Sequence, residues 1–370
     1  MRNLSTEQVR LLRLRSQRLH PETARSISSV ARLIKEICGL QAQELPSAVL
    51  AARPRSTDLV ADDVKKAREG DRSIVLTWCM RGTIHLVPVD DLSWLLAFLG
   101  PIFIHKSQRR YKQLGLDPET RMRAKKVIRD VLSRRGPLTR PELAEALAEK
   151  RIPVEGQAIA HLVRYAALEG VICFGPEREG ELTYVNLEDW TQLEGQLDQG
   201  RALAELARRY LQAYGPATPG DFASWSGISI GQARDGFEAI SNQLLEVAAM
   251  DAPAWMLKRY SDWIDEPRDE AGLHLLPRYD AYLLGYRSRD FMVSLSYARR
   301  IHPGGGIIRQ SVIADGRAIG LWRRERKKDR SIIVIELFEA SGEDIMPDLE
   351  SEVQDIGRFL EVRTELHIEN

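Results

Sequence analysis

The chain is poor in cysteine: its three, Cys38, Cys79 and Cys173, lie far apart and form no Cys-x-x-Cys pair. The basic N-terminal stretch also lacks the apolar core of a signal peptide, so we expect a cytoplasmic protein in a reducing compartment. No apolar run approaches the length of a membrane span, and we therefore expect no membrane partner. The seven histidines show no ligand spacing, so we expect no metal and no nucleotide cofactor.

An excess of charge of either sign is also absent. The chain has 53 Lys and Arg against 53 Asp and Glu, so its net charge alone does not indicate a polyanionic partner. The apolar fraction of 44% and the charged fraction of 29% are those of an ordinary globular protein. A length of 370 residues predicts two to four domains.

A weak internal repeat is the most informative feature of the sequence. Residues 136–147 read GPLTRPELAEAL, and residues 215–226 read GPATPGDFASWS. In each copy a threonine precedes an acidic residue by three positions (Thr139 with Glu142, Thr218 with Asp221), which predicts a capping box at the start of a helix.

The surroundings of both copies predict a winged helix. Each capped helix has a helical segment before it, another after it, and then a strand–turn–strand pattern. A looser third copy at the N-terminus ends in SIVLTWCMRGTIHLVPV, two strands joined at Arg81-Gly82-Thr83. We therefore expect winged helices at residues 1–95, 120–190 and 198–262.

From about residue 265 the pattern changes to short apolar runs separated by glycine turns. Asp315-Gly316 between two β-rich runs is a strong hairpin signal. We expect a β-barrel-like domain at residues 265–370 with a final amphipathic helix around DLESEVQDIGRFLEV. The predicted fold class is α+β, with three tandem winged-helix modules followed by this domain.

Basic residues gather in two places. Between residues 106 and 140 twelve Lys and Arg face three acidic residues, and six more follow Trp322. Such runs can be solvated helix faces, but together with winged helices they indicate contacts with the phosphates of duplex DNA. The candidate DNA-binding residues from these clusters are Arg109, Arg110, Lys112, Lys125, Lys126, Arg323 and Arg324.

Four segments carry a family resemblance: GLQAQELPSAVLAAR (39–53), RGTIHLV (81–87), LLPRYDAYLLGYRSR (275–289) and DGRAIGLWRR (315–324). Together and in this order they resemble the winged-helix family of bacterial alkylpurine DNA glycosylases of the AlkZ and AlkX types. The resemblance implies three winged helices closed by a β-barrel, and duplex DNA with alkylated purines, interstrand crosslinks included, as the substrate. It also places the family's catalytic Gln-apolar-Gln motif, in its AlkZ form, on Gln41 and Gln43.

Two amides are a credible catalytic set only for a special substrate. An N7-alkylated purine already carries a positive charge, so no general acid has to protonate the leaving base. A glutamine carbonyl can accept a hydrogen bond from water, and its amide can donate to a sugar or phosphate oxygen. We expect a metal-independent DNA glycosylase. The alternative is a non-enzymatic winged-helix protein with a DNA-binding or regulatory role.

The geometry of the motif sets a condition. Residues two apart point to opposite sides of a regular helix, so Gln41 and Gln43 can converge only if the chain after Gly39 is extended or irregular. Pro46 makes such a break plausible. Otherwise both glutamines are ordinary polar residues near a helix end. The neighbouring Glu44 can act as a general base, although the family pattern does not support that role.

Two residues of the N-terminal hairpin are further DNA-binding candidates. Arg81 lies at the turn, where it can meet a phosphate. His85 shares a strand face with Thr83 and Val87. It either reaches DNA from the wing or holds the hairpin from a half-buried position, and the sequence leaves both interpretations open.

Overall fold

The computed structural model describes residues 2–24, 27–192, 195, 197–250, 252–266, 271–339 and 345–369. It divides into two compact units, one formed by Met1–Val64 with Ala204–Asn370 and one by Lys65–Leu203. The first expected module, residues 1–95, contributes to both units. Among the described residues, no helix is both long and apolar enough to cross a membrane.

The unit Lys65–Leu203 contains helices and one antiparallel sheet. Its strands follow the order β4-β3-β5-β6. Its elements are β3 (Ile74–Trp78), β4 (Ile84–Pro88), α5 (Val89–Lys106), α6 (Gln108–Gln113), α7 (Pro118–Arg135), α8 (Arg140–Ala148), α9 (Ala158–Leu168), β5 (Ile172–Arg178), β6 (Glu181–Asn186) and α10 (Leu187–Trp190), with α4 (Ala61–Glu69) at its boundary.

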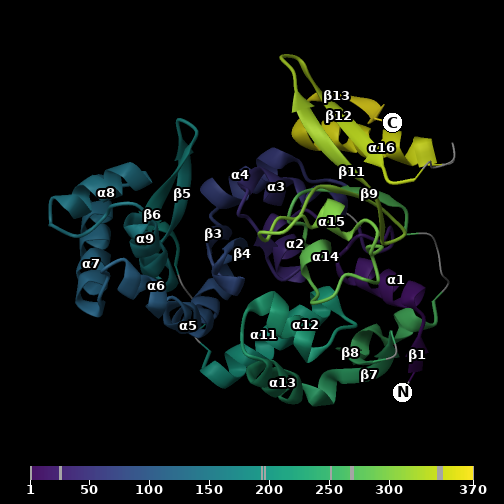
Figure 1. The fold of residues 1–370 in the computed structure, drawn as a ribbon, viewed down its shortest axis with the longest axis horizontal. Coiled ribbons are helices and arrows are strands. Elements are labelled where there is room, and N and C mark those ends of the chain that lie inside the picture. The colour runs from purple at the N-terminus through teal and green to yellow at the C-terminus, as the bar shows by residue number, and fades with distance from the viewer. Residues whose placement is uncertain are drawn as a thin grey trace. The chain divides into compact units, whose positions relative to one another are not determined.

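Helix α9 is the core element of this unit. It packs against α5, α7 and the strands β3 and β5, and Figure 1 shows it between α7 and the β5–β6 hairpin. Gly100 of α5 allows a close approach, since an added Cβ there would lie 2.2 Å from the carbonyl oxygen of Leu168. Most positions of α9 are buried, including Leu162, Val163 and Ala166. Most side chains of α9 therefore pack in the interior of the unit, and few are available to contact a ligand.

The other unit is built from both ends of the chain. Its elements are β1 (Arg2–Leu4), α1 (Thr6–Ser16), α2 (Val30–Glu36), β2 (Leu40–Gln41), α3 (Leu45–Leu50), the 3₁₀ turn η1 (Arg53–Arg55), α11 (Gln199–Tyr214, at the boundary), α12 (Pro219–Ser226), α13 (Ile230–Glu238), β7 (Leu244–Ala249), β8 (Ala252–Leu257), β9 (Leu273–Leu276), α14 (Ala281–Leu284), α15 (Ala298–Ile301), β10 (Ser311–Ala314), β11 (Arg317–Arg326), β12 (Arg330–Leu337), α16 (Met346–Leu360) and β13 (Arg363–Glu369).

Both copies of the sequence repeat have the expected element order of helix, capped helix, helix and hairpin. The N–H of Thr139 donates to the Glu142 carboxylate at 2.7 Å, and the N–H of Thr218 donates to Asp221 at 3.0 Å. The first copy runs from α7 to β6 and the second from α11 to β8. The caps predicted from the two threonines are thus confirmed.

One feature of the second copy was not predicted. Strand β1 pairs in parallel with β7 and adds a third strand to the β7–β8 hairpin. Leu4, Val9 and Leu12 form a buried cluster with Val247 and Met256 of this hairpin. The N-terminal residues therefore belong to the core of the second copy, a long-range pairing that no local pattern indicates.

The C-terminal strands form an open sheet, so the expected closed barrel is not found among the described residues. Their order is β13-β12-β11-β10-β9, with β9 and β13 at the edges. Side chains occupy the outer edge of β9, because the N–H of Leu275 donates to Glu352 of α16 and its carbonyl accepts from Arg53. An edge covered in this way does not need a further strand.

The turn and the final helix expected for this domain are both present, and one further strand was not expected. Asp315 and Gly316 join β10 to β11 with φ angles of 43° and 76°, as expected for a hairpin turn with left-handed residues. The final helix is present as α16 and packs on β9 and β13. Strand β13, which pairs in parallel with β12, was missed because three of the seven residues in its sequence RTELHIE are charged.

Candidate functional site

The glutamine motif follows directly on the end of helix α2. Cys38 and Gly39 both adopt positive φ angles, 60° and 89°, and the N–H of Gly39 donates to the carbonyl of Ile34 at 2.9 Å. A glycine in this conformation ends a helix without steric cost. The chain then runs extended through Leu40–Gln41 and re-enters a helix only at Leu45.

Burial alternates along the motif. Gln41 is half-buried, Ala42 is buried at 3% exposure, and Gln43 is exposed. Such alternation is typical of extended chain, in which residues two apart face the same side. The condition set by the sequence, a non-helical backbone after Gly39, is therefore met, and Ala42 anchors the segment in the core.

Glu44 is engaged by neighbouring side chains. Its carboxylate forms an ion pair with Arg278 and accepts a hydrogen bond from the hydroxyl of Ser47 at 3.1 Å. Both members of the ion pair are partly exposed, with 40% of the Glu44 side chain and 35% of the Arg278 side chain open to solvent. Arg278 and Ser47 thus fix the orientation of this carboxylate next to the motif.

Arg55 links the segment that carries the motif to the stretch around Asp280. Both side chains of this ion pair are fully buried, with nitrogen–oxygen distances of 2.7 and 2.9 Å. The remaining donors of Arg55 bond to the carbonyl oxygens of Gln17 and Ala51 and to the side-chain oxygen of Gln17. All five guanidinium N–H groups thus have acceptors, which is the condition under which a buried charge is tolerated.

Arg53 makes a parallel link to the C-terminal helix. Its guanidinium contacts Glu352 at 2.6 Å and Asp355 at 2.8 Å, and it donates to the carbonyl of Leu275. Burial alone would raise the pKa of Glu352, but Arg53 and His274 hold that pKa far below its usual value. Neither Arg53 nor Arg55 could be predicted as a buried residue, because nothing local in the sequence distinguishes a buried arginine from an exposed one.

A cavity of about 290 Å³ lies beside the ion pair of Glu44. Arg278, Arg309, Gln310, Trp322 and Arg323 line it, among others. Trp322 is buried, and its ring N–H donates to the carbonyl of Leu276 at 2.8 Å. Arg278 therefore connects the residue next to the glutamine motif with a polar, cation-lined cavity.

The first basic cluster forms the surface of α6 and α7. Arg109 and Lys112 are exposed and have no carboxylate partner among the described residues. Arg110 donates to the side-chain oxygens of Gln113 and Gln157 and keeps its charge unpaired. These three residues, close together on one short helix, match the expectation of an unneutralised positive surface.

Other members of this cluster have structural partners. Lys125 forms an ion pair with Glu169 at 2.8 Å, whereas Lys126 on the next position is exposed. Arg121 is buried at 6% exposure, donates to the carbonyl of Leu116 and lies over the ring of Tyr111. The positive surface is thus smaller than the count of basic residues implied.

The N-terminal hairpin places Arg81 and His85 in different environments. Arg81 lies in the β3–β4 connection with φ 55° and is half-buried. His85 is only 2% exposed, and its Nδ1 lies 3.0 Å from the carbonyl oxygen of Thr83. Burial and the nearby Arg81 lower the pKa of His85 to about 3. This environment fits the interpretation in which His85 holds the hairpin, and not the one in which it reaches DNA.

The second basic cluster lies on the β11–β12 hairpin and is partly neutralised. Arg323 pairs with Glu369 of β13, and Arg330 with Glu365. Arg324 is half-buried and donates to the Ser331 hydroxyl at 2.9 Å. Strand β13, missed from the sequence, supplies both acidic partners, so the cluster carries less free charge than expected.

The Arg55–Asp280 ion pair predicts a large effect on stability. Replacement of Arg55 by leucine should lower the free energy of unfolding by about 3–5 kcal/mol, because the Asp280 carboxylate would stay buried without its partner. Urea unfolding of the full chain measures this, with the exposed Arg363→Leu as the matched control. The double change Arg55→Leu, Asp280→Asn should recover part of the loss. A loss below about 1 kcal/mol, the range of surface ion pairs, would show that the pair does not hold the segments together.

The burial of His85 predicts a pH dependence. The unfolded chain takes up a proton near the ordinary histidine pKa of 6.5, whereas the folded chain takes it up only near 3. The contribution of neutral His85 is therefore complete above pH 6.5 and is lost as the pH falls. The stability advantage of the wild type over His85→Gln should shrink by about 2–3 kcal/mol between pH 7 and pH 4.5. If the difference in unfolding free energy between wild type and His85→Gln stayed constant with pH, His85 would be exposed to solvent and not buried.

Comparison with known proteins gives one family for this arrangement. The model of the AlkZ-like DNA glycosylase family matches residues 34–359. An interstrand DNA cross-link repair glycosylase of Streptomyces sahachiroi is 27% identical over 332 residues, which cover 86% of this chain and 87% of that protein.

A solved structure has the same fold. The DNA glycosylase AlkZ of Streptomyces sahachiroi superposes with a TM-score of 0.85 at 24% identity, over 99% of this chain and 100% of that one. The family match covers most of the chain and includes the glutamine motif and the segments that Arg53, Arg55 and Arg278 hold beside it. The chain belongs to the AlkZ-like DNA glycosylase family.

Proposed function

We propose that this protein hydrolyses the N-glycosidic bond of cationic N7-alkylpurines in duplex DNA, interstrand crosslinks included. Gln41 and Gln43 would position the attacking water and stabilise the sugar. The observation that carries the proposal is the non-helical Gln41-Ala42-Gln43 segment after Gly39 in a chain of this family. The name of the curated relative, an interstrand DNA cross-link repair glycosylase, supports crosslinks as substrates.

The two amides match the needs of this reaction. N7-alkylation makes the purine a cationic leaving group, so the bond to the sugar breaks without a general acid. What remains is to hold a water molecule in line and to stabilise an oxocarbenium-like sugar. Both glutamines lie on non-helical backbone, so the helical spacing that would separate them does not apply. An amide offers both an acceptor for water and a donor for sugar or phosphate oxygens.

The partners of Glu44 support a reaction without a general base from that residue. Arg278 and Ser47 hold its carboxylate, so its role in the proposal is to fix the backbone after Gln43. Without a free carboxylate beside the glutamines, neutral bases, which need protonation to leave, would be poor substrates. We propose that this restricts the enzyme to cationic lesions.

We further propose that the two repeat copies, from α7 to β6 and from α11 to β8, are winged helices, with a looser third one at the N-terminus and a C-terminal β domain. The third helix of the first copy, α9, is largely buried. Duplex DNA would therefore meet exposed cations of α6 and α7, and Arg81, rather than a recognition helix. Such contacts read phosphates and not sequence.

Binding to duplex DNA should fall steeply with salt and depend little on sequence. Charge reversal of Arg109, Arg110 and Lys112 to glutamate should weaken binding to every duplex tested and reduce the salt dependence. A fluorescence-anisotropy titration measures both. The matched control reverses three exposed cations of the other unit, Lys258, Arg299 and Arg363, with the same change in net charge. Equal affinity of the α6 variant and the wild type would remove α6 from the DNA surface.

Each single change, Gln41→Ala or Gln43→Ala, should lower the rate of N7-methylguanine excision by about 10- to 1,000-fold, the range for one lost positioning or electrostatic group. Affinity for a duplex with an abasic site should stay nearly unchanged, and Gln43→Asp should retain activity. The exposed Gln354→Ala serves as the matched control. Single-turnover release of the free base gives the rate. A double alanine variant that excises as fast as the wild type would contradict the mechanism.

A further inference from the structure

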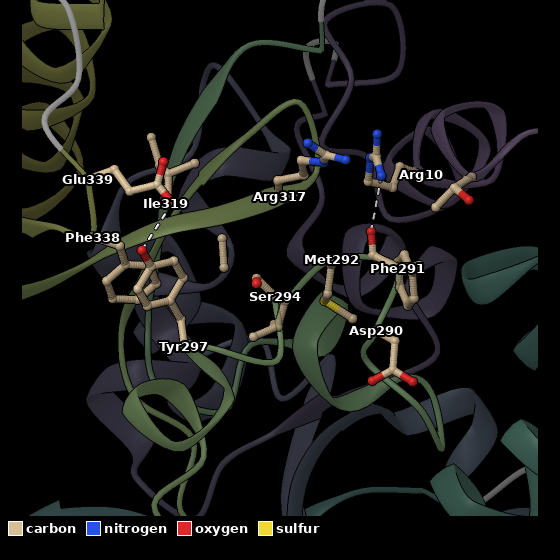
Figure 2. A pocket seen from close by; sticks show the side chains of 13 residues that line it. Arg10, Asp290, Phe291, Met292, Ser294, Tyr297, Arg317, Ile319, Phe338 and Glu339 are labelled. Atoms are coloured by element: carbon tan, nitrogen blue, oxygen red, sulfur yellow. Dashed lines mark hydrogen bonds between the residues drawn. The ribbon is translucent and has the colours of Figure 1, made fainter.

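A cavity of about 630 Å³ lies between helix α1 and the loop and strands that follow α14. None of the predicted site residues lines it. Figure 2 shows two arginines, Arg10 and Arg317, at one end, and the aromatic side chains of Tyr297 and Phe338 at the other. Ligand pockets for small molecules usually measure roughly 300–1,000 Å³, so this cavity has the size of a binding site.

The cationic end is built by the hairpin turn between β10 and β11. Gly316 has a φ of 76°, and an added Cβ would lie 3.1 Å from the Cβ of Arg10 and 2.8 Å from the hydroxyl of Tyr282. That hydroxyl donates to the Gly316 carbonyl at 2.9 Å. The tight packing of this turn on α1 brings Arg317, the next residue, beside Arg10.

Neither arginine has a carboxylate partner among the described residues. Arg10 is only 8% exposed; one terminal nitrogen donates to the carbonyl of Phe291 at 3.2 Å, and its buried Nε has no partner. The side chain of Arg317 is exposed, and no hydrogen bond or ion pair joins it to another residue that the structure describes. Burial and the charge of Arg317 lower the pKa of Arg10, and the charges of Glu7 and Asp315 oppose this shift by less. Two adjacent unpaired guanidinium groups at a cavity favour an anion between them.

The carboxylates of the cavity do not neutralise this end. Glu339 accepts a hydrogen bond from the Tyr297 hydroxyl at 3.0 Å, at the aromatic end. Figure 2 shows the Asp290 carboxylate directed away from the two guanidinium groups. The charges are thus separated along the cavity.

The other end offers a flat apolar wall. The rings of Tyr297 and Phe338 are stacked, with centroids 4.4 Å apart and planes at 20°. Backbone hydrogen bonds fix the wall and the floor: the N–H of Phe338 donates to Ile319, and that of Ala318 to Met292, both at 2.8 Å. The cavity is therefore formed in advance, with a place for an aromatic ring at one end and for an anion at the other.

We propose that this cavity is a second binding site, for a phosphoryl group carried by an aromatic nucleotide, with Arg10 and Arg317 on the phosphate and the Tyr297–Phe338 wall beside the base. The phosphate can come from a free mononucleotide or from a DNA strand. The site is separate from Gln41 and Gln43, so it binds its ligand whether or not the chain excises bases.

The test uses the full chain and deoxyguanosine 5′-monophosphate as the probe, with calorimetric titration as the measurement. Deoxyguanosine, which lacks the phosphate, should bind at least roughly tenfold more weakly, because charge-assisted hydrogen bonds to two arginines are lost. Arg317→Gln should lower the affinity for the nucleotide by a similar factor, and Tyr297→Leu should lower the affinity for both ligands. Arg363→Gln and Gln41→Ala should bind like the wild type.

A competition experiment between the nucleotide and duplex DNA then distinguishes the two sources of the phosphate. If a duplex with 5′-hydroxyl ends displaces the nucleotide, and does so only when Arg317 is present, the phosphate comes from DNA. If it does not, the site takes a free nucleotide. The proposal is wrong if deoxyguanosine binds as tightly as the nucleotide, or if Arg317→Gln, with an unchanged melting temperature, leaves nucleotide affinity unaltered.

Discussion

The buried ion pair between Arg55 and Asp280 is the interaction on which the surroundings of the glutamine motif depend. It joins the segment that starts at Gly39 to the stretch that follows β9, and the contacts of Arg53 with Leu275 and of Glu44 with Arg278 run between the same two stretches. A charged pair removed from water is stable only in a narrow geometry in which every donor is satisfied. Its main effect is therefore to fix position: few other arrangements of these segments would keep both charges bonded.

The contacts that hold the glutamine segment in place also matter for the proposed chemistry. Ala42 is held in the core while Gln43 faces solvent, so a short non-helical segment presents amides on a rigid support. Catalytic groups that only position water gain from such support, because their contribution lies in orientation and not in basicity. In the proposed reaction the positive charge of the lesion supplies the driving force that other hydrolases obtain from an acid.

The features that could be predicted from the sequence are those with local causes. Gly39 ends a helix, Thr139 and Thr218 cap helices, and Asp315-Gly316 makes a turn, because each depends on backbone conformations that these residue types prefer. What could not be predicted depends on long-range partners. Nothing near Arg55 indicates burial. The open sheet and the strand β13 with its acidic residues also follow from contacts between residues tens of positions apart, and the β1–β7 pairing from contacts across more than two hundred. For the same reason, a count of basic residues overstated the positive surface.

The most direct measurement of the central claim is the release of free base by the wild-type protein. The purified chain is incubated, without added metal or cofactor, with one duplex that carries a single N7-methylguanine and a matched duplex that carries guanine. The account predicts release of N7-methylguanine well above the spontaneous rate and no release of guanine. Tight binding of both duplexes without release from any N7-alkylated substrate would contradict it, and would leave a DNA-binding protein without catalytic activity.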